Sequence, residues 1–426
     1  MIIDDILKVI YAPKKAFKNI IANPKYLGAI IVLVLFLALQ VGYEYSQFSK
    51  TNIEQTAPTA DQFPTFINAS AWTASPGVTL TNHDADYFNY SVYIASFGTT
   101  PTDPLGYYSL FGNSSLQIEA TNTSNLTVAL GGVFNVDCSE IGFQNLSMTI
   151  KQVEPQTAPQ TATLTLYSLS DTDFYRYDLT SELSAASIIN QWGNLTIPIG
   201  KTAQGWTSNG TPSWSNITAL TLDLTYPENS NITLRVGALF FRGQYLSPIE
   251  FNSAAVLLQF LQVFTLQFIA GWLILSAILY LFFKAFKGAV VWKPLFVAVG
   301  FALFVMVIRG LVNLVGTFTL PTLYMPFDMT LGLRFNAFGV FYYPAEAVST
   351  LSVQTQTAIG IFESATSTLM TMTSAIFLIS YVWLAGLCTI IVGELKPEFS
   401  LIKRIAMSSV SVAATILLLL FIIGIA

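Results

Sequence analysis

Cysteine, histidine and charged residues are scarce in this sequence. Its 426 residues include two cysteines and one histidine, and only 10% are charged. Cys138 lies among strand-forming residues and Cys388 inside an apolar run, which excludes a disulfide framework. One histidine and two thiols also supply too few ligands for a typical zinc site. We therefore expect no metal and no cofactor.

The common catalytic and nucleotide-binding motifs are also missing. The sequence contains no G-x-x-x-x-G-K-S/T, G-x-G-x-x-G, H-E-x-x-H or G-x-S-x-G, so phosphate cradles, metalloprotease sites and nucleophile elbows lack support. A S-x-x-K at Ser400 to Lys403 lies in a basic loop without the companion motifs of penicillin-binding enzymes. We predict a non-enzymatic protein with no catalytic residues.

Apolar residues are abundant instead, at 53% of the chain. Five apolar runs come close to or pass the length of about 18 residues that indicates a membrane helix. They cover residues 27–43, 253–283, 294–317, 366–393 and 405–426. The first run has an apolar core longer than that of a signal peptide, and no small-x-small cleavage motif follows closely. It is therefore interpreted as a retained anchor.

Basic residues near these runs predict the orientation in the membrane. Three short segments hold 11 of the 19 lysines and arginines, namely Lys8, Lys14, Lys15, Lys18, Lys25, Lys284, Lys287, Lys293, Lys396, Lys403 and Arg404. Positively charged loops stay in the cytoplasm. The amino terminus is thus predicted to be cytoplasmic, and the carboxyl terminus and residues 44–250 extracytoplasmic, in a multi-pass protein of the plasma membrane.

N-x-Ser/Thr sequons follow the same division. All ten lie between the first and second runs, at Asn68, Asn89, Asn113, Asn122, Asn125, Asn145, Asn194, Asn209, Asn216 and Asn231. A region rich in Asn, Ser and Thr generates some sequons by chance, but their confinement to the segment predicted to be outside favours glycosylation. Dense sequons without disulfides favour an archaeal cell surface.

Residues 44–250 form the predicted extracytoplasmic domain. With 6 basic and 17 acidic residues, a net charge of −11 argues against a nucleic-acid partner. Short alternating runs bounded by Gly, Pro, Asn and Asp, including residues 86–97, predict about nine strands and a β-sandwich. Within it, "NITALTLDLTYPENSNITL", residues 216–234, is predicted to be a hairpin that turns at Pro-Glu-Asn-Ser.

Residues 173–243 resemble jelly-roll domains of the carbohydrate-binding or galactose-binding-like kind, through their strand rhythm and the placement of tryptophan. That resemblance implies contact with a glycan through exposed aromatic rings, and Trp192, Trp206 and Trp214 are the candidates. The alternative is that these rings close the sandwich core, which is the commoner role of large aromatics.

Three aspartates in "SDTDFYRYD" raise the question of calcium. Asp171, Asp173 and Asp178 supply hard oxygen ligands, but no glycine-centred loop with full ligand spacing accompanies them. We predict a solvated turn and no metal site.

Residues 1–26 are predicted to be a cytoplasmic amphipathic segment, with apolar residues at helical spacing opposite lysines. Pro13, Phe17, Asn23 and Pro24 stand where a Yip1-type domain has its P-x-x-x-F and N-P motif, followed by five membrane helices. The resemblance implies a non-enzymatic membrane scaffold. The sequence departs from that family in the roughly 200 residues between its first two helices.

Arg309 is the ionisable residue well inside a predicted span, with Asn313 one turn further on. A charge inside the membrane is a functional hypothesis by default. The structural alternative is that Arg309 snorkels to the outer interface, or pairs with Asp328 or Glu363 in the extracytoplasmic loop 318–365. This alternative is favoured.

Together these patterns predict a multi-domain α + β fold: a five-helix transmembrane bundle carrying an all-β, jelly-roll-like sandwich. The leading function is a surface glycoprotein on a Yip1-like scaffold, with membrane lipid and a glycan or surface protein as partners. The alternative is a transporter or an accessory subunit that binds other subunits of a membrane complex.

The topology prediction can be tested on intact cells. Protease added outside should cleave within residues 44–250 and spare a tag fused at Met1, because the basic segments hold the amino terminus in the cytoplasm. Immunoblotting of both regions measures this. A protected 44–250 segment would contradict the predicted orientation.

Overall fold

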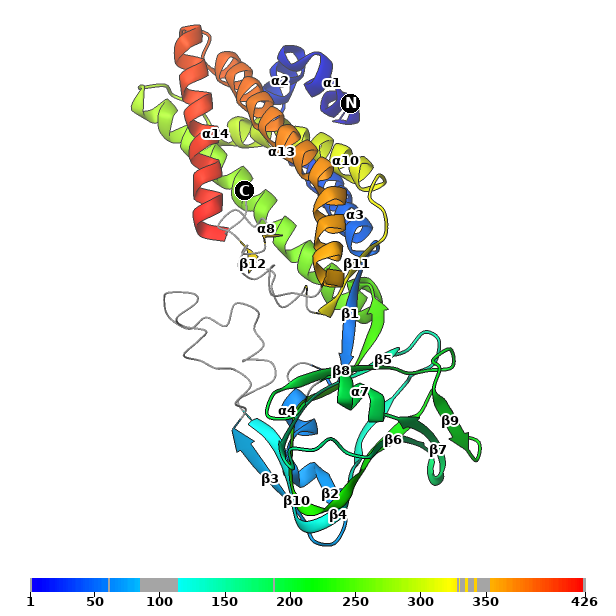
Figure 1. The fold of residues 1–426 in the computed structure, drawn as a ribbon. Helices are drawn as coiled ribbons and strands as arrows, with labels where there is room; N and C mark the ends of the chain where they lie inside the picture. Colours follow the sequence, from blue (N-terminus) through cyan, green and yellow to red (C-terminus); the bar gives the residue numbers. More distant parts are fainter. Residues whose placement is uncertain are drawn as a thin grey trace.

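A helical bundle and a β-sandwich make up the chain (Figure 1). The computed structural model describes residues 2–59, 62–84, 114–186, 188–327, 329, 334–335, 341–342 and 353–423. The predicted strand at 86–97, the sequons Asn89 and Asn113, and Asp328 lie outside these residues. The predicted α + β fold class is confirmed by the described residues.

Five helical segments are long and apolar enough to cross a membrane. They contain α3 (Tyr26–Phe48), α8 (Pro248–Ala285), α9 (Trp292–Ala302) with α10 (Phe304–Thr317), α13 (Val353–Leu395) and α14 (Leu401–Ile423). The third segment is central, because 72% of its most apolar window is buried against 28–39% in the other four. The bundle therefore packs around α9 and α10.

Two of the helices extend well beyond the predicted spans. The 43 residues of α13 measure about 65 Å at 1.5 Å per residue, twice the hydrocarbon thickness of about 30 Å. Helix α8 begins at Pro248, where Ser247 and Glu250 form a capping box. Polar residues at the amino-terminal ends of both helices kept these ends out of the apolar runs, and the capping box stabilises the first turn of α8,.

The amino-terminal segment folds onto the bundle as two short helices, α1 (Ile2–Tyr11) and α2 (Pro13–Ala22). Their apolar faces join the bundle core, and Phe17 is fully buried. These helices lie at the end of the bundle remote from the sandwich, whereas α14 runs back towards the sandwich (Figure 1). Helix α14 thus ends nearer to the sandwich than α1 and α2 lie (Figure 1).

The sandwich has two antiparallel layers that share their two longest strands. One layer runs in the order β2, β4, β10, β6, β7, β9 and the other in the order β3, β4, β10, β5, β8. The strands are β2 (Trp72–Ala74), β3 (Val78–Asp84), β4 (Ser114–Val136), β5 (Asn145–Glu154), β6 (Thr161–Ser168), β7 (Ser170–Asp178), β8 (Gly193–Pro198), β9 (Trp206–Asn209) and β10 (Ile217–Leu246).

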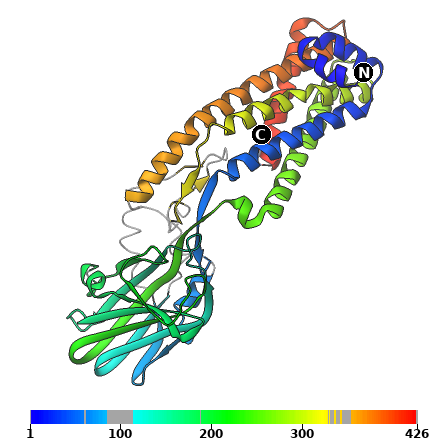
Figure 2. The ribbon, with the colours of Figure 1, turned by 90° about the vertical axis from the view of Figure 1, so that its right-hand side faces the viewer.

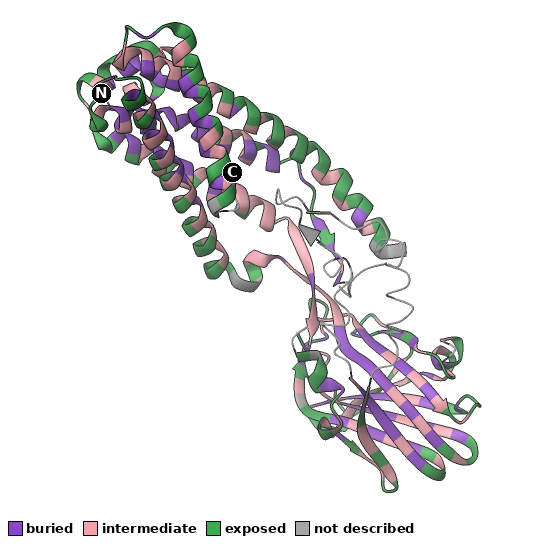
Figure 3. Ribbon diagram, turned by 90° about the vertical axis from the view of Figure 1, so that its left-hand side faces the viewer, coloured by how far each residue is buried: buried purple, intermediate pink, exposed green. Residues whose placement is uncertain are grey.

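Alternation of side chains builds the sandwich core. Leu220, Leu222 and Leu224 on β10 point inward and are at most 2% exposed, while Thr221 and Asp223 between them lie on the opposite face of the strand. The same two-residue period repeats along β4, β5 and β6 (Figure 3), as expected for strands with one buried face. This period is what made the sandwich predictable.

The predicted hairpin at residues 216–234 is wrong. Strand β10 continues through this segment, and its two halves pair with β4, β5 and β6 and not with each other. Register shifts between Thr225 and Ile232 bend β10 from one layer into the other. Tyr226 is buried at this corner and donates a hydrogen bond to Gln152 Oε1 (3.0 Å). The Pro-Glu-Asn-Ser segment therefore bends β10 without ending it. Strand β4 bends at the same place and stays paired with β10 on both sides.

A three-stranded neck joins the sandwich to the bundle (Figure 2). Strand β1 (Thr51–Ala57), which follows α3, pairs with the end of β10 on one side and with β11 (Leu323–Met325) on the other. Glu54 on β1 is 5% exposed. Its two oxygens accept from Arg242 Nε and Nη2 at 2.8 Å, and one also accepts from the Phe327 N–H at 2.6 Å.

The neck pair gives a stability prediction. Arg242→Met leaves the Glu54 carboxylate buried without its cation, which costs about 3–5 kcal/mol when one partner of a buried pair is removed. Lys201→Met is the control, because Lys201 and Glu140 form an exposed pair (77% and 68% exposed) of the kind that contributes little. Urea unfolding of the full chain, followed by tryptophan fluorescence, measures both. Equal losses in the two variants would contradict the role given to the neck.

Candidate aromatic groove and polar residues of the helical bundle

Four aromatic rings gather at one edge of the sandwich. Tyr175 and Tyr177 lie on β7, Trp206 lies on β9, and Trp214 precedes β10. Tyr177 pairs with Trp206 across the two strands, and both tyrosines are opposite inward-facing leucines of β6. The rings therefore lie on the inner face of one layer, at an edge that the other layer covers only in part.

These rings are held in fixed positions. Trp214 stacks on Tyr175 with 3.8 Å between ring centroids and 9° between planes, and Trp206 meets Trp214 edge-on at 5.4 Å. Trp206 Nε1 donates to the carbonyl of Pro198, at the end of β8 in the opposite layer (2.8 Å). Trp206 and Trp214 are both partly buried and pack against the sandwich core.

The tyrosine hydroxyls are engaged as well. Tyr175 donates to the Pro212 carbonyl (2.8 Å) and Tyr177 donates to Glu182 Oε1 (2.7 Å). The hydrogen bond to Glu182, together with burial, raises the pKa of Tyr177 to about 12. Tyr177 therefore remains a neutral donor across the physiological pH range.

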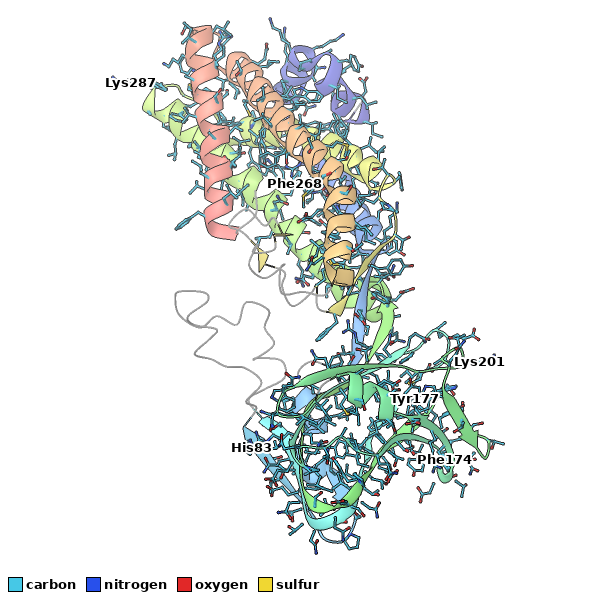
Figure 4. The ribbon with its side chains drawn as sticks, viewed as in Figure 1. His83, Phe174, Tyr177, Lys201, Phe268 and Lys287 are labelled. Carbon is cyan, nitrogen blue, oxygen red and sulfur yellow. The ribbon has the colours of Figure 1, made fainter. Side chains whose placement is uncertain are left out.

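A groove opens beside the stacked pair. It is lined by Tyr175 and Trp214 and by a polar rim made up of Ser139, Glu140, Lys201, Ser213 and Ser215. Tyr177 and Lys201 lie at the same edge of the sandwich (Figure 4). Half-exposed aromatic surface thus adjoins hydroxyls, a carboxylate and an ammonium group. An apolar floor with a few polar groups is the usual composition of a small-ligand site.

Of the three predicted tryptophans, the structure brings Trp206 and Trp214 together. Trp192 is half-buried just before β8 and does not line the groove. Tyr175, Glu140 and Lys201 were not predicted. Alternation in "DFYRYDL" marks Tyr175 as inward-facing, but nothing in the sequence places Glu140 and Lys201 beside it.

The aspartates of β7 serve as local hydrogen-bond acceptors. Asp173 accepts from the Thr211 N–H and from Ser170 Oγ, both at 2.7 Å, and these bonds lower its pKa. Asp178 accepts from the Thr180 N–H at 2.9 Å. Among the described residues, no group of three or more His, Cys, Asp or Glu could hold a metal ion.

Sequon asparagines differ in exposure. Asn145 and Asn216 are half-buried, and Asn216 Oδ1 is buried without a partner. The others that the structure describes are exposed, namely Asn68, Asn122, Asn125, Asn194, Asn209 and Asn231. The exposed asparagines stand where a glycan would meet solvent.

Inside the bundle, Arg309 is half-buried and lines a cavity, and Asn313 is 4% exposed. Arg309 lies eight residues before the end of α10, about 12 Å along its axis. Its guanidinium lies over the Phe377 ring of α13 (4.7 Å). No ion pair joins Arg309 to Glu363 among the described residues, and the snorkelling of Arg309 stays a prediction.

Comparison with known proteins gives distant likenesses to the sandwich. A family 11 carbohydrate-binding module from Clostridium thermocellum, in complex with a β-1,3-1,4-mixed-linked tetrasaccharide, matches with a TM-score of 0.27 and 12% identity, over 45% of this chain and 95% of that one. An agarase matches with a TM-score of 0.26 and 9% identity, over 40% of this chain and 24% of that one.

An arabinose-bound α-L-arabinofuranosidase matches with a TM-score of 0.25 and 12% identity, over 41% of this chain and 23% of that one. No family model and no curated protein matches the sequence. The Yip1-type resemblance therefore stays a prediction. TM-scores this low transfer no activity, so binding has to be argued from this chain's own residues.

Proposed function

We propose that the chain is a non-enzymatic multi-pass membrane protein that presents a glycan-binding β-sandwich outside the plasma membrane. The observation that carries this proposal is the stacked Tyr175–Trp214 pair beside a polar rim. A sugar ring has an apolar C–H face and a border of hydroxyls, each of which donates and accepts hydrogen bonds. In the groove, the aromatic rings complement the apolar face and the polar rim complements the hydroxyls.

The rim groups fit this role. Ser213 and Ser215 hydroxyls are 2.8 Å apart, and Glu140 and Lys201 form a loose, exposed pair at 3.5 Å. Such exposed pairs contribute little to folding, so both groups remain free to exchange their contact for hydroxyls of a ligand. The rings beneath are fixed, which lowers the ordering cost of binding.

On the membrane side we propose a Yip1-like scaffold embedded in lipid. Its support is the count of five spans and the position of Phe17, which lies in the proposed family motif and is fully buried against the bundle. We also propose glycans on the exposed asparagines, with Asn122 and Asn209 foremost because both are exposed, Asn122 within β4 and Asn209 at the end of β9. The segment 44–250 would then be the outward glycoprotein portion.

A transporter or accessory subunit of a membrane complex is the second candidate. The specific observation in its favour is the presence of polar side chains inside the bundle, Gln40, Gln267 and Arg309. A bundle that served only as an anchor would not need them. Purification in mild detergent with other subunits bound would favour this candidate.

Glycan binding is tested with the full chain in nanodiscs on a glycan array, followed by titration of the best ligand. Trp214→Ala removes the stacking surface and should weaken binding about tenfold or more. Trp192→Ala is the matched control, since Trp192 lies outside the groove, and should bind normally. Lys201→Met probes the rim without disturbing the aromatic packing and should also weaken binding.

Two results would contradict the proposal. One is the absence of any bound glycan on the array. The other is a ligand whose affinity is the same for Trp214→Ala and the unaltered chain.

A further inference from the structure

A small cavity lies inside the helical bundle, enclosed by α3, α8, α10, α13 and α14. Its volume is about 50 Å³. Much of the wall is apolar and includes Phe268, which lies among the helices in Figure 4. The remaining lining consists of five polar side chains, one from each helix: Gln40, Gln267, Arg309, Tyr381 and Thr415. Five separate helices thus direct polar groups to one point.

Several of these polar groups lack a hydrogen-bond partner. Gln40 is 8% exposed, and its Oε1, like Gln267 Oε1 and Arg309 Nε, is buried without a partner. Asn313, one turn beyond Arg309 on α10 but outside the cavity lining, is 4% exposed and has an unpartnered Oδ1 as well. An unmet buried polar group is costly anywhere, and within a membrane bundle water does not readily replace the partner. Such a concentration of them indicates a ligand.

The charge at this point is positive, and no carboxylate of the described residues pairs with it. Arg309 stays protonated in proteins. Its cation–π contact with Phe377 offsets only part of the cost of holding a charge in the bundle. A bound negative charge would satisfy both the guanidinium and its free N–H.

We infer that this cavity binds a compact monovalent anion, of the size of chloride or formate. Arg309 Nε–H supplies the charge-assisted donor,. The amides of Gln40 and Gln267 donate to the anion in the flipped orientation, in which the NH2 group takes the place of the unpartnered Oε1,. About 50 Å³ holds three or four water-sized groups,. A lipid phosphate with its glycerol therefore does not fit, whereas a small anion with one or two waters does.

Water as the occupant of the cavity explains the lining less well than a small anion does. Waters would satisfy the glutamine and asparagine oxygens, but they would leave the arginine charge without a counterion. The apolar wall made by Phe36, Leu303 and Leu384 among others strengthens any charge pair inside, because it lowers the local dielectric. The site is therefore built for an anion that is partly desolvated.

The test measures the thermal midpoint of the full chain in nanodiscs of zwitterionic lipid. Chloride or formate replaces gluconate at constant ionic strength and pH, and radioactive chloride binding gives the affinity directly. The midpoint should rise saturably with either small anion, as for any ligand of the native state. Arg309→Met should weaken binding about thirtyfold or more, and Gln40→Leu should weaken it as well.

Arg176→Met is the matched control. Arg176 also lies over a phenylalanine ring, that of Phe174 (5.1 Å), but it is exposed on the outer face of the sandwich. Its loss should leave the anion dependence unchanged. Should Arg309→Met fail to fold, Arg309→Lys retains the charge but lacks Nε and the planar fork, and it should still weaken anion binding.

Three results would overturn the inference. The first is no saturable dependence on either small anion, which would leave water as the occupant. The second is equal anion dependence in the Arg309 variants and the unaltered chain. The third is stabilisation by a larger amphiphile such as octanoate with none by chloride or formate. Each outcome is independent of glycan binding by the sandwich.

Discussion

The buried carboxylate of Glu54 holds together segments that are far apart in the chain. Arg242 binds both of its oxygens, and the Phe327 N–H binds one of them. These groups come from the strand after the first span, the end of the sandwich and the loop after the third span. A buried carboxylate is tolerated only when paired in this way. The position of the sandwich over the bundle depends on this pairing.

Other contacts in the neck extend the same constraint. Lys50 Nζ donates to the carbonyls of Thr317, Phe318 and Leu320 at the end of α10, where a cation offsets the negative end of the helix dipole. Tyr245 meets Tyr324 edge-on, and Phe240 packs on Phe327. Helix α10 also carries Arg309, so the neck connects the sandwich mechanically to the helix that lines the cavity.

The sequence predicted the strands and helices whose burial imposes a regular pattern of apolar residues. It did not predict contacts between residues that are far apart in the chain. Two-residue alternation on β10 and long apolar runs predicted the sandwich and the five candidate spans, because burial of a face imposes those periods. The Pro227 turn signal was misread, since only the pairing of β10 with β4 makes it a corner. The groove and the cavity remained hidden because Glu140 and Lys201, or Gln40 and Arg309, meet only in the fold.

Hydrogen exchange of the full chain in nanodiscs tests the coupling of sandwich and bundle most directly. If the neck is one structural unit, amides in 51–57, 241–246 and 323–325 should exchange as slowly as those of the central sandwich strands, and Glu54→Gln should accelerate all three segments together. Exchange at the rate of an open linker in the unaltered chain, or acceleration confined to one segment, would contradict this account.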